Sequence, residues 1–189
     1  MPSYIPKQQA RLNPKECVFI CIDIQEKLFN VMQNKDKMLK NANKLLEGAK
    51  IFGANSIVLE QYPQGLGRAL LRNQENPKES LIEKISFSAF GEQNFCKALE
   101  KLQATTLILF GIETHICVKE SAFDAKEKGF KVLIAEDACS SRELHSHSLA
   151  IQEMRDLKIQ ISSTESILFS FLLHAKETNF KAISTLIKN

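Results

Sequence analysis

The chain has 189 residues, of which 44% are hydrophobic and 25% are charged, and its formal net charge at pH 7 is +3. This length and composition predict a single globular domain covering residues 1–189. The small net charge, with lysines scattered among acids, gives no basis for binding nucleic acid or a membrane surface. No apolar run approaches the roughly 20 residues of a membrane span, and residues 1–9 lack the apolar core of a secretory signal. We therefore expect a cytoplasmic protein, with targeting to an organelle left open.

In chain order, the first half begins with a short apolar strand and a long stretch of helical spacing. The strand is predicted at 18–22, the helical spacing covers 26–52 with a break at Asn34, and a second strand follows at 56–60. Segment 61–77 is rich in Pro, Gly and Asn, which predicts a long loop. A short strand, a helix and a further strand are then predicted at 81–85, 92–102 and 105–110.

The second half continues the alternation of helices and strands. Its predicted elements are a helix at 118–128, a strand at 131–136, an acidic turn at 137–141, a helix at 144–157, a strand at 159–162, and helices at 163–176 and 180–188. Such alternation is typical of βαβ units. Because right-handed crossovers cover both sheet faces, we predict a three-layer α/β/α fold with a mainly parallel, doubly wound (Rossmann-like) sheet of about six strands.

Two polar residues follow predicted buried strands. Asp23 comes directly after the first strand, and Cys117 opens the helix predicted after the fourth. In doubly wound folds, ligands bind beyond the carboxyl ends of the strands, so both residues are expected on one rim. A carboxylate in a partly desolvated place is a better base, although Asp23 also fits a helix N-cap. A thiol at a helix N-terminus has a lowered pKa, which predicts that Cys117 is a nucleophilic thiolate.

The other candidates are weaker when they are judged by spacing alone. Cysteines are among the most buried residue types, and we interpret four of the five as small core residues: Cys17, Cys21, Cys96 and Cys139. Their odd number and unpaired spacing do not favour disulfides. Lys84 is most simply an exposed surface lysine. His115 is a candidate base for Cys117, whereas His145 and His147 point to different faces of a helix and are interpreted as solvated, so no metal site is predicted.

Three segments in register resemble the isochorismatase-like cysteine hydrolase superfamily: Ile20–Gln25 (ICIDIQ), Ile82–Lys84 (IEK) and Gly111–Val118 (GIETHICV). Further segments are similar to the branch of isochorismatase domain-containing proteins, namely 60–67, 83–88, 137–142, 164–169 and 179–188. The resemblance covers nearly the whole chain.

The resemblance implies a catalytic triad of Asp23, Lys84 and Cys117. In it, Asp23 accepts the thiol proton, Cys117 attacks an amide-type carbonyl to form a thioester, and Lys84 stabilises the thiolate and orients Asp23. It also implies a cis peptide bond between Ile112 and Glu113, with the backbone N–H groups of Glu113 and Cys117 forming the oxyanion hole.

The resemblance also suggests which residues line the substrate pocket, namely Gln25, Tyr62, Phe87 and His115. Metal-dependent nicotinamidases of this superfamily carry an Asp-x-His motif where this chain has Glu60-Gln61-Tyr62, so we expect no metal and no cofactor. True isochorismatases often lack the cysteine, which argues against that reaction here.

The expected partner is a small-molecule substrate, and the expected assembly is a homo-oligomer. The alternative is a catalytically weak protein that acts through oligomer or partner contacts. RNA cleavage, which has been attached to relatives of this branch, is disfavoured by the lack of a basic patch.

Overall fold

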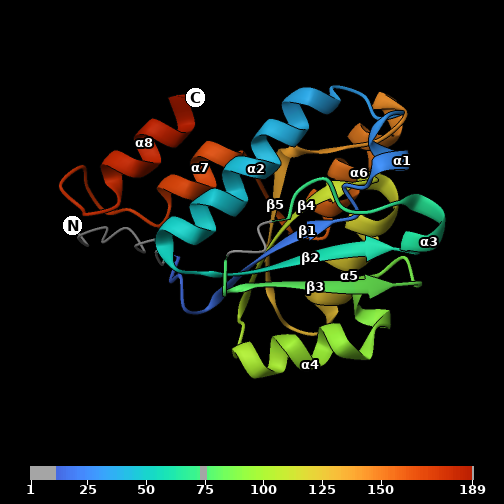
Figure 1. Ribbon diagram of the computed structural model, residues 1–189, viewed down its shortest axis with the longest axis horizontal. Helices are drawn as coiled ribbons and strands as arrows, with labels where there is room; N and C mark the ends of the chain where they lie inside the picture. Colours follow the sequence, from blue (N-terminus) through green and yellow to red (C-terminus); the bar gives the residue numbers. More distant parts are fainter. Residues whose placement is uncertain (1–11, 73–75, 189) are drawn as a thin grey trace, which may run out of the picture.

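The computed structural model describes residues 12–72 and 76–188. Six strands form one sheet in the order β3-β2-β1-β4-β5-β6, and all their pairings are parallel (Figure 1). The strands are β1 (Cys17–Ile22), β2 (Asn55–Gln61), β3 (Glu79–Lys84), β4 (Thr106–Ile112), β5 (Lys131–Ser140) and β6 (Gln160–Ser162). The predicted doubly wound α/β fold is therefore confirmed, and its topological switch point lies between β1 and β4.

Helices cover both faces of the sheet (Figure 1). One layer consists of α2 (Lys35–Phe52), α7 (Thr164–Phe169) and α8 (Phe180–Lys188), which contact one another. The opposite layer consists of α4 (Gln93–Leu102), α5 (Lys119–Glu127) and α6 (Leu144–Asp156). Short elements lie between the main ones: α1 (Glu26–Phe29), α3 (Pro63–Leu66), the 3₁₀-helix η1 (Ala89–Gly91) and the single π-helical turn η2 (Thr114–Val118). Within the described residues, no helix combines the length and apolar character that a membrane crossing requires.

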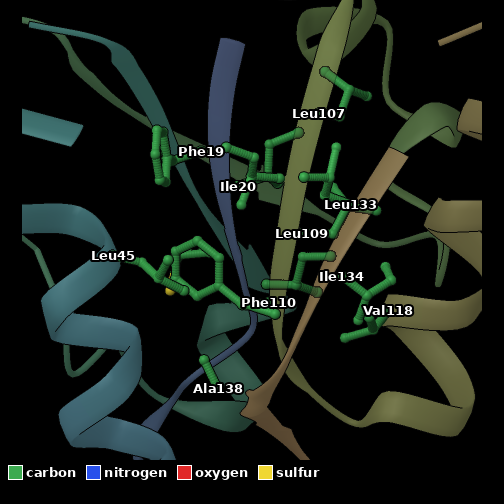
Figure 2. Close-up of a cluster of buried hydrophobic side chains, with 14 of the residues drawn as sticks. Phe19, Ile20, Leu45, Leu107, Leu109, Phe110, Val118, Leu133, Ile134 and Ala138 are labelled. Atoms are coloured by element: carbon green, nitrogen blue, oxygen red, sulfur yellow. The ribbon is translucent and has the colours of Figure 1, made fainter. Parts of the chain in front are cut away.

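The central strands are apolar along their whole length because both of their faces are covered. Every residue of β1 and of β4 is buried. Figure 2 shows Leu45 of α2 and Val118 of η2 on opposite sides of these strands. Continuous apolar runs therefore identified the middle of the sheet correctly, and the polar residues that follow them are placed at its carboxyl edge.

The structure corrects three predicted elements. The prediction of an acidic turn at 137–141 is wrong because β5 continues to Ser140, and Cys139 pairs with Gly111 of β4. The polar side chain of Asp137 is accommodated there because it accepts hydrogen bonds from the backbone N and the hydroxyl of Thr164, at 2.7 and 2.8 Å. The helix predicted at 163–176 ends at Phe169, and the loop predicted at 61–77 contains α3; residues 73–75 lie outside the described part.

Candidate active site

The carboxyl ends of four neighbouring strands bring the predicted triad together. Asp23 directly follows β1, Lys84 ends β3, and Cys117 lies in η2, the turn that follows β4. Strand β2 lies between β1 and β3, and its last residue, Gln61, is in register with Lys84. Residues that are far apart along the chain therefore meet at the switch point of the sheet.

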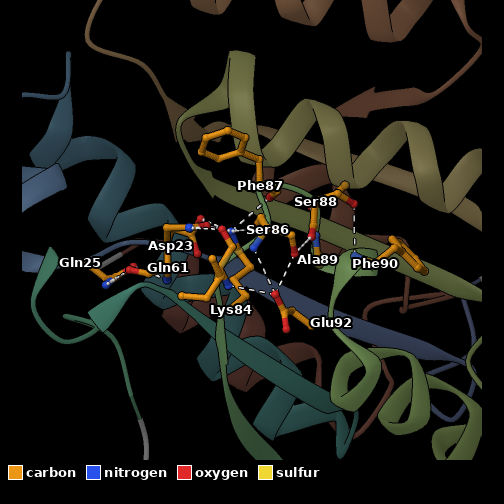
Figure 3. Close-up of polar contacts among 12 residues, drawn as sticks. Asp23, Gln25, Gln61, Lys84, Ser86, Phe87, Ser88, Ala89, Phe90 and Glu92 are labelled. Carbon is orange, nitrogen blue, oxygen red and sulfur yellow. Dashed lines mark hydrogen bonds and ion pairs between the residues drawn. The ribbon is translucent and has the colours of Figure 1, made fainter. Parts of the chain in front are cut away.

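Lys84 and Asp23 form a buried ion pair (Figure 3). The Lys84 Nζ lies 2.8 Å from Oδ2 of Asp23, and both side chains are 0% exposed. The ammonium also contacts Oε1 of Gln61 at 2.6 Å and two backbone carbonyl oxygens, those of Ser86 and Phe87, both at 3.2 Å. The interpretation from spacing alone, an exposed surface lysine, is therefore wrong, because burial of Lys84 depends on strand pairing that its neighbours in sequence do not reveal. The buried, paired cation that the family resemblance implied is present.

Asp23 has the environment of a base rather than that of a helix cap. The N-cap of α1 is Gln25, so the N-cap interpretation of Asp23 is wrong. Asp23 has a left-handed backbone conformation, with φ of 54°. Burial raises the pKa of its carboxyl group, while the charge of Lys84 and hydrogen bonds with Lys84 and Cys117 act in the opposite direction. A raised carboxyl pKa suits a group that must take up a proton during a reaction.

Cys117 is buried beside this ion pair, with 6% of its surface exposed. Burial, followed by the negative charge of Asp23, raises the pKa of the thiol to about 12, and Lys84 lowers it only in part. The predicted low-pKa thiolate is therefore wrong for the resting protein. Desolvation outweighs the favourable position just before α5. Cys117 therefore rests as a thiol, close enough to Asp23 for the carboxylate to influence its pKa.

The turn that carries Cys117 begins at a cis peptide bond between Ile112 and Glu113, the position at which one was expected. Glu113 is 6% exposed, and its carboxylate accepts hydrogen bonds from Arg142, from the backbone N at 2.9 Å and from Nε at 3.1 Å. The side chain of Glu113 thus fixes the start of the turn to the segment after β5. The participation of the Glu113 and Cys117 N–H groups in an oxyanion hole stays a prediction.

Two histidines add further contacts between this turn and the part of the chain that follows β5. The Nδ1 atom of His147 lies 2.9 Å from Oγ1 of Thr114, and Nδ1 of His115 lies 3.0 Å from Oγ of Ser141. His147 was interpreted as solvated, which is wrong, because its side chain is only 16% exposed and faces η2 from α6. Three consecutive residues that precede Cys117 in its turn, 113–115, are thereby held by side-chain contacts to segment 141–147.

The predicted substrate-contact residues occupy different environments. Gln25 is 0% exposed, and its amide is engaged by backbone groups: Nε2 donates to Gln61 O and Gly67 O, and Oε1 accepts from Gln61 N. This arrangement favours a structural role for Gln25. Tyr62 and Phe87 are 52% and 62% exposed and directly adjoin the groups that hold Lys84. Their contact with a substrate, and that of His115, stays a prediction.

Comparison with known proteins identifies the family. Residues 17–166 match the Isochorismatase domain. The chain belongs to the isochorismatase family. It is 31% identical over 179 residues to isochorismatase domain-containing protein 1 of Danio rerio, covering 95% of this chain and 63% of that relative, so it spans less than two thirds of that protein. It is 34% identical over 182 residues to isochorismatase domain-containing protein 2 of Danio rerio, covering 94% and 90% of the two chains.

Among solved structures, the fold resembles that of the MAR1 ribonuclease of Caenorhabditis elegans. The TM-score is 0.88 at 27% sequence identity, and the match covers 95% of this chain and 93% of that one. Together with the family match, this similarity shows that the protein has an isochorismatase-like hydrolase fold.

Two residues of this isochorismatase-family site were not found by sequence reasoning. Gln61 contacts Lys84 directly, and Glu92 accepts hydrogen bonds from the backbone N of Ile85 and from Ser86, which lowers the pKa of Glu92 and fixes the turn after Lys84 (Figure 3). The position of Gln61, a polar residue at the end of an apolar strand, is a signal of the same kind as that of Asp23, but no comparable pattern points to Glu92.

Across residues 12–72 and 76–188, no three His, Cys, Asp or Glu side chains form a group that could hold a metal ion.

Proposed function

We propose that the protein is a cysteine hydrolase that cleaves an amide-type C–N bond of a small molecule through a thioester, by a scheme that uses no metal ion. The observation that supports this most strongly is the fully buried Asp23–Lys84 ion pair, both members of which influence the pKa of the buried Cys117 thiol. A buried ion pair contributes little to stability by itself. Perturbed titratable groups gathered at a strand edge are typical of catalytic sites.

In the first half-reaction, Asp23 takes the Cys117 proton while Sγ attacks the carbonyl carbon of the substrate. Lys84 stabilises the negative charge that passes from the carboxylate to sulfur and then to the carbonyl oxygen. The backbone N–H groups of Glu113 and Cys117 are the proposed donors to that oxygen, and the loss of one such donor typically costs about 3 kcal/mol of transition-state stabilisation. When the C–N bond breaks, the proton held by Asp23 passes to the leaving amine.

In the second half-reaction, water attacks the thioester carbon and Asp23 accepts a proton from that water. The C–S bond then breaks, the product leaves as a carboxylic acid, and the proton returns to sulfur. In the resting protein Asp23 and Cys117 share one proton, which leaves with the amine and is replaced from water in the second half-reaction, so the pH dependence belongs to the pair and not to either residue alone.

The test is hydrolysis of a panel of small amides by the parent protein and by Cys117→Ala. Cys96→Ala is the matched control, because Cys96 lies on α4, away from the triad. We expect Cys117→Ala to reduce kcat/KM by at least about a thousandfold while Cys96→Ala stays near the parent, since a covalent mechanism requires the sulfur. Trapping of an acyl group on Cys117, seen by mass spectrometry, gives independent support, whereas hydrolysis that survives Cys117→Ala contradicts the proposal.

The C. elegans structure carries the name of a ribonuclease, which makes RNA a second candidate substrate. A thiol with a carboxylate base suits attack on a carbonyl carbon, and the triad is buried, so we favour the small amide. An RNA substrate in the same panel decides between them. Hydrolysis of neither class would favour the alternative of a catalytically weak protein that acts through oligomer contacts.

A further inference from the structure

Gln61 is a buried amide that the mechanism above does not use. It ends β2 and is 9% exposed. Its Oε1 lies 2.6 Å from Lys84 Nζ, the shortest of the contacts made by that nitrogen, and its Nε2 donates to Ile85 O at 2.6 Å (Figure 3). The second hydrogen bond fixes which way the amide faces, because a reversed amide would turn its NH₂ group toward the ammonium.

The oxygens around Lys84 differ in charge. An ammonium has three N–H donors, and the structure places four oxygens near it: the carboxylate of Asp23, the amide of Gln61 and two backbone carbonyls. Only the Asp23 oxygen carries a formal charge. Asp23 is therefore the one anion that these contacts place against the ammonium, while the charge of Lys84 also lowers the pKa of the Cys117 thiol and contributes to lowering that of Glu92.

Gln61 is itself held in place. Its backbone N and O are both bonded to the amide of Gln25, at 2.7 and 3.0 Å. Its backbone also lies close enough to Asp23 to lower the pKa of that carboxyl group. Gln61 thus contacts Lys84 through its side chain and influences the pKa of Asp23 through its main chain.

We infer that Gln61 is a positioning residue for the hydrolase proposed above, and that its neutral oxygen aims Lys84 at Asp23 and Cys117 while keeping a second negative charge away from them. The inference rests on the proposed function. A carboxylate at this position would share the ammonium with Asp23. Its oxygen, at the place of the Gln61 oxygen 2.6 Å from Lys84 Nζ, would lie within roughly 6 Å of the Asp23 carboxylate, a distance at which a like charge raises the pKa of an acidic group.

The experiment measures the rate at which methyl methanethiosulfonate, a small thiol reagent, labels Cys117 between pH 6 and pH 10.5. Peptide mass spectrometry follows Cys117 separately from Cys96, which lies outside the site and serves as the internal reference. The variants are Gln61→Glu, which adds a charge with little change of shape, and Gln61→Met, which removes the oxygen without adding charge. Gln152→Glu places the same charge on the exposed face of α6 and is the matched control.

We expect the pH–rate profile of Cys117 in Gln61→Glu to move to higher pH by at least about one unit relative to Gln61→Met, which is a tenfold slower rate at a given pH. Gln152→Glu and the Cys96 rates stay at the parent values. Gln61→Met lowers kcat/KM about tenfold, because Lys84 loses its nearest acceptor. Equal pH–rate profiles for Gln61→Glu and Gln61→Met, whether displaced from the parent or not, overturn the inference.

Labelling needs no substrate, so the two proposals fail separately. If the parent protein hydrolyses no amide, the proposed function fails, while the displacement of the labelling profile still shows whether Gln61 controls the charge around Cys117. If amides are hydrolysed but the profiles coincide, only the role of Gln61 is lost.

Discussion

The two ends of the sheet both contain residues with positive φ, but for different reasons. At the amino end, four such residues each follow a helix and precede a strand: Gly53 (φ 66°), Gln103 (φ 50°), Gly129 (φ 86°) and Lys158 (φ 60°). At the carboxyl end, they stand where strands finish, and include Asp23 (φ 54°), Tyr62 (φ 36°) and Gly111 (φ 128°). The first group consists of ordinary helix caps, and the second lies at the candidate active site.

The surroundings of the two groups separate them further. A Cβ added to Gly129 would meet nothing within 4 Å, whereas a Cβ added to Gly111 would lie 2.0 Å from the carbonyl oxygen of Ile22. Caps at the amino end are stabilised within their own helix, as when Gln103 N donates to Glu100 O at 3.0 Å. Conformation at the carboxyl end is instead imposed by neighbouring strands, which is why that end can hold buried charges in one arrangement.

The largest expected effect comes from alanine at the two glycines. Gly111→Ala should lower the free energy of unfolding by more than about 4 kcal/mol, or prevent folding, because β1 and β4 backbones must separate. Gly129→Ala should cost only about 1 kcal/mol, since conformational strain is its sole penalty. Urea denaturation measures both, and similar losses would contradict the contrast between the two ends.

Lys84→Met should follow in size. Removal of one partner of a buried ion pair typically costs about 3–5 kcal/mol, because the other charge stays buried. Lys101→Met, on the exposed surface of α4, is the control and should change stability by less than about 0.5 kcal/mol.

The loss of unfolding free energy caused by Lys84→Met should depend on pH, and the loss should grow as the pH rises. Burial already raises the pKa of Asp23, and loss of the lysine charge raises it further. Toward low pH both folded proteins bind this proton, so the difference in stability between them is smallest at the acidic end. It should grow as the pH rises past the point at which Asp23 ionises in the parent. Urea denaturation at pH 4, 6 and 8 tests this, and a deficit that shrinks with pH would count against a buried Asp23–Lys84 pair.

A smaller effect is expected at His147, whose ring contacts Thr114 of η2, the turn that carries Cys117. Burial lowers the pKa of His147, while Glu136, 3.7 Å from Nε2, acts in the opposite direction. The folded state therefore binds protons less readily than the unfolded state, and stability should fall as the pH drops below about 6.5. His147→Gln should lose this part of the pH dependence of the melting temperature, and His145→Gln, at an exposed position of the same helix, should keep it.

The smallest effect is a stabilisation at the amino end. Gln103→Gly should raise the free energy of unfolding by about 0.5–1 kcal/mol, since glycine adopts the left-handed C-cap of α4 without steric cost. Gln152→Gly, in the exposed interior of α6, should instead cost about 1 kcal/mol. Thermal unfolding of both variants measures the two changes in stability. Destabilisation by Gln103→Gly would contradict the interpretation of the positive-φ residues at the amino end as ordinary helix caps.

Much of the fold follows from local patterns. The apolar run of β1, the helical spacing of α2 and the break at Asn34 each depend on residues a few positions apart, and all three were predicted within one or two residues. The acidic turn at 137–141 failed because Asp137 is satisfied by Thr164, a residue distant in sequence. Local periodicity cannot register such a partner.

The sequence by itself determined the alternation of strands and helices, hence the doubly wound sheet, and it placed Asp23 and Cys117 at the edge where strands end. Only the tertiary structure decided that Lys84 is buried against Asp23, that Gln61 completes its contacts, and that the Cys117 thiol has a raised pKa. The physical reason is that strand formation depends on neighbours along the chain. Burial and charge at one atom depend on elements brought together by strand order.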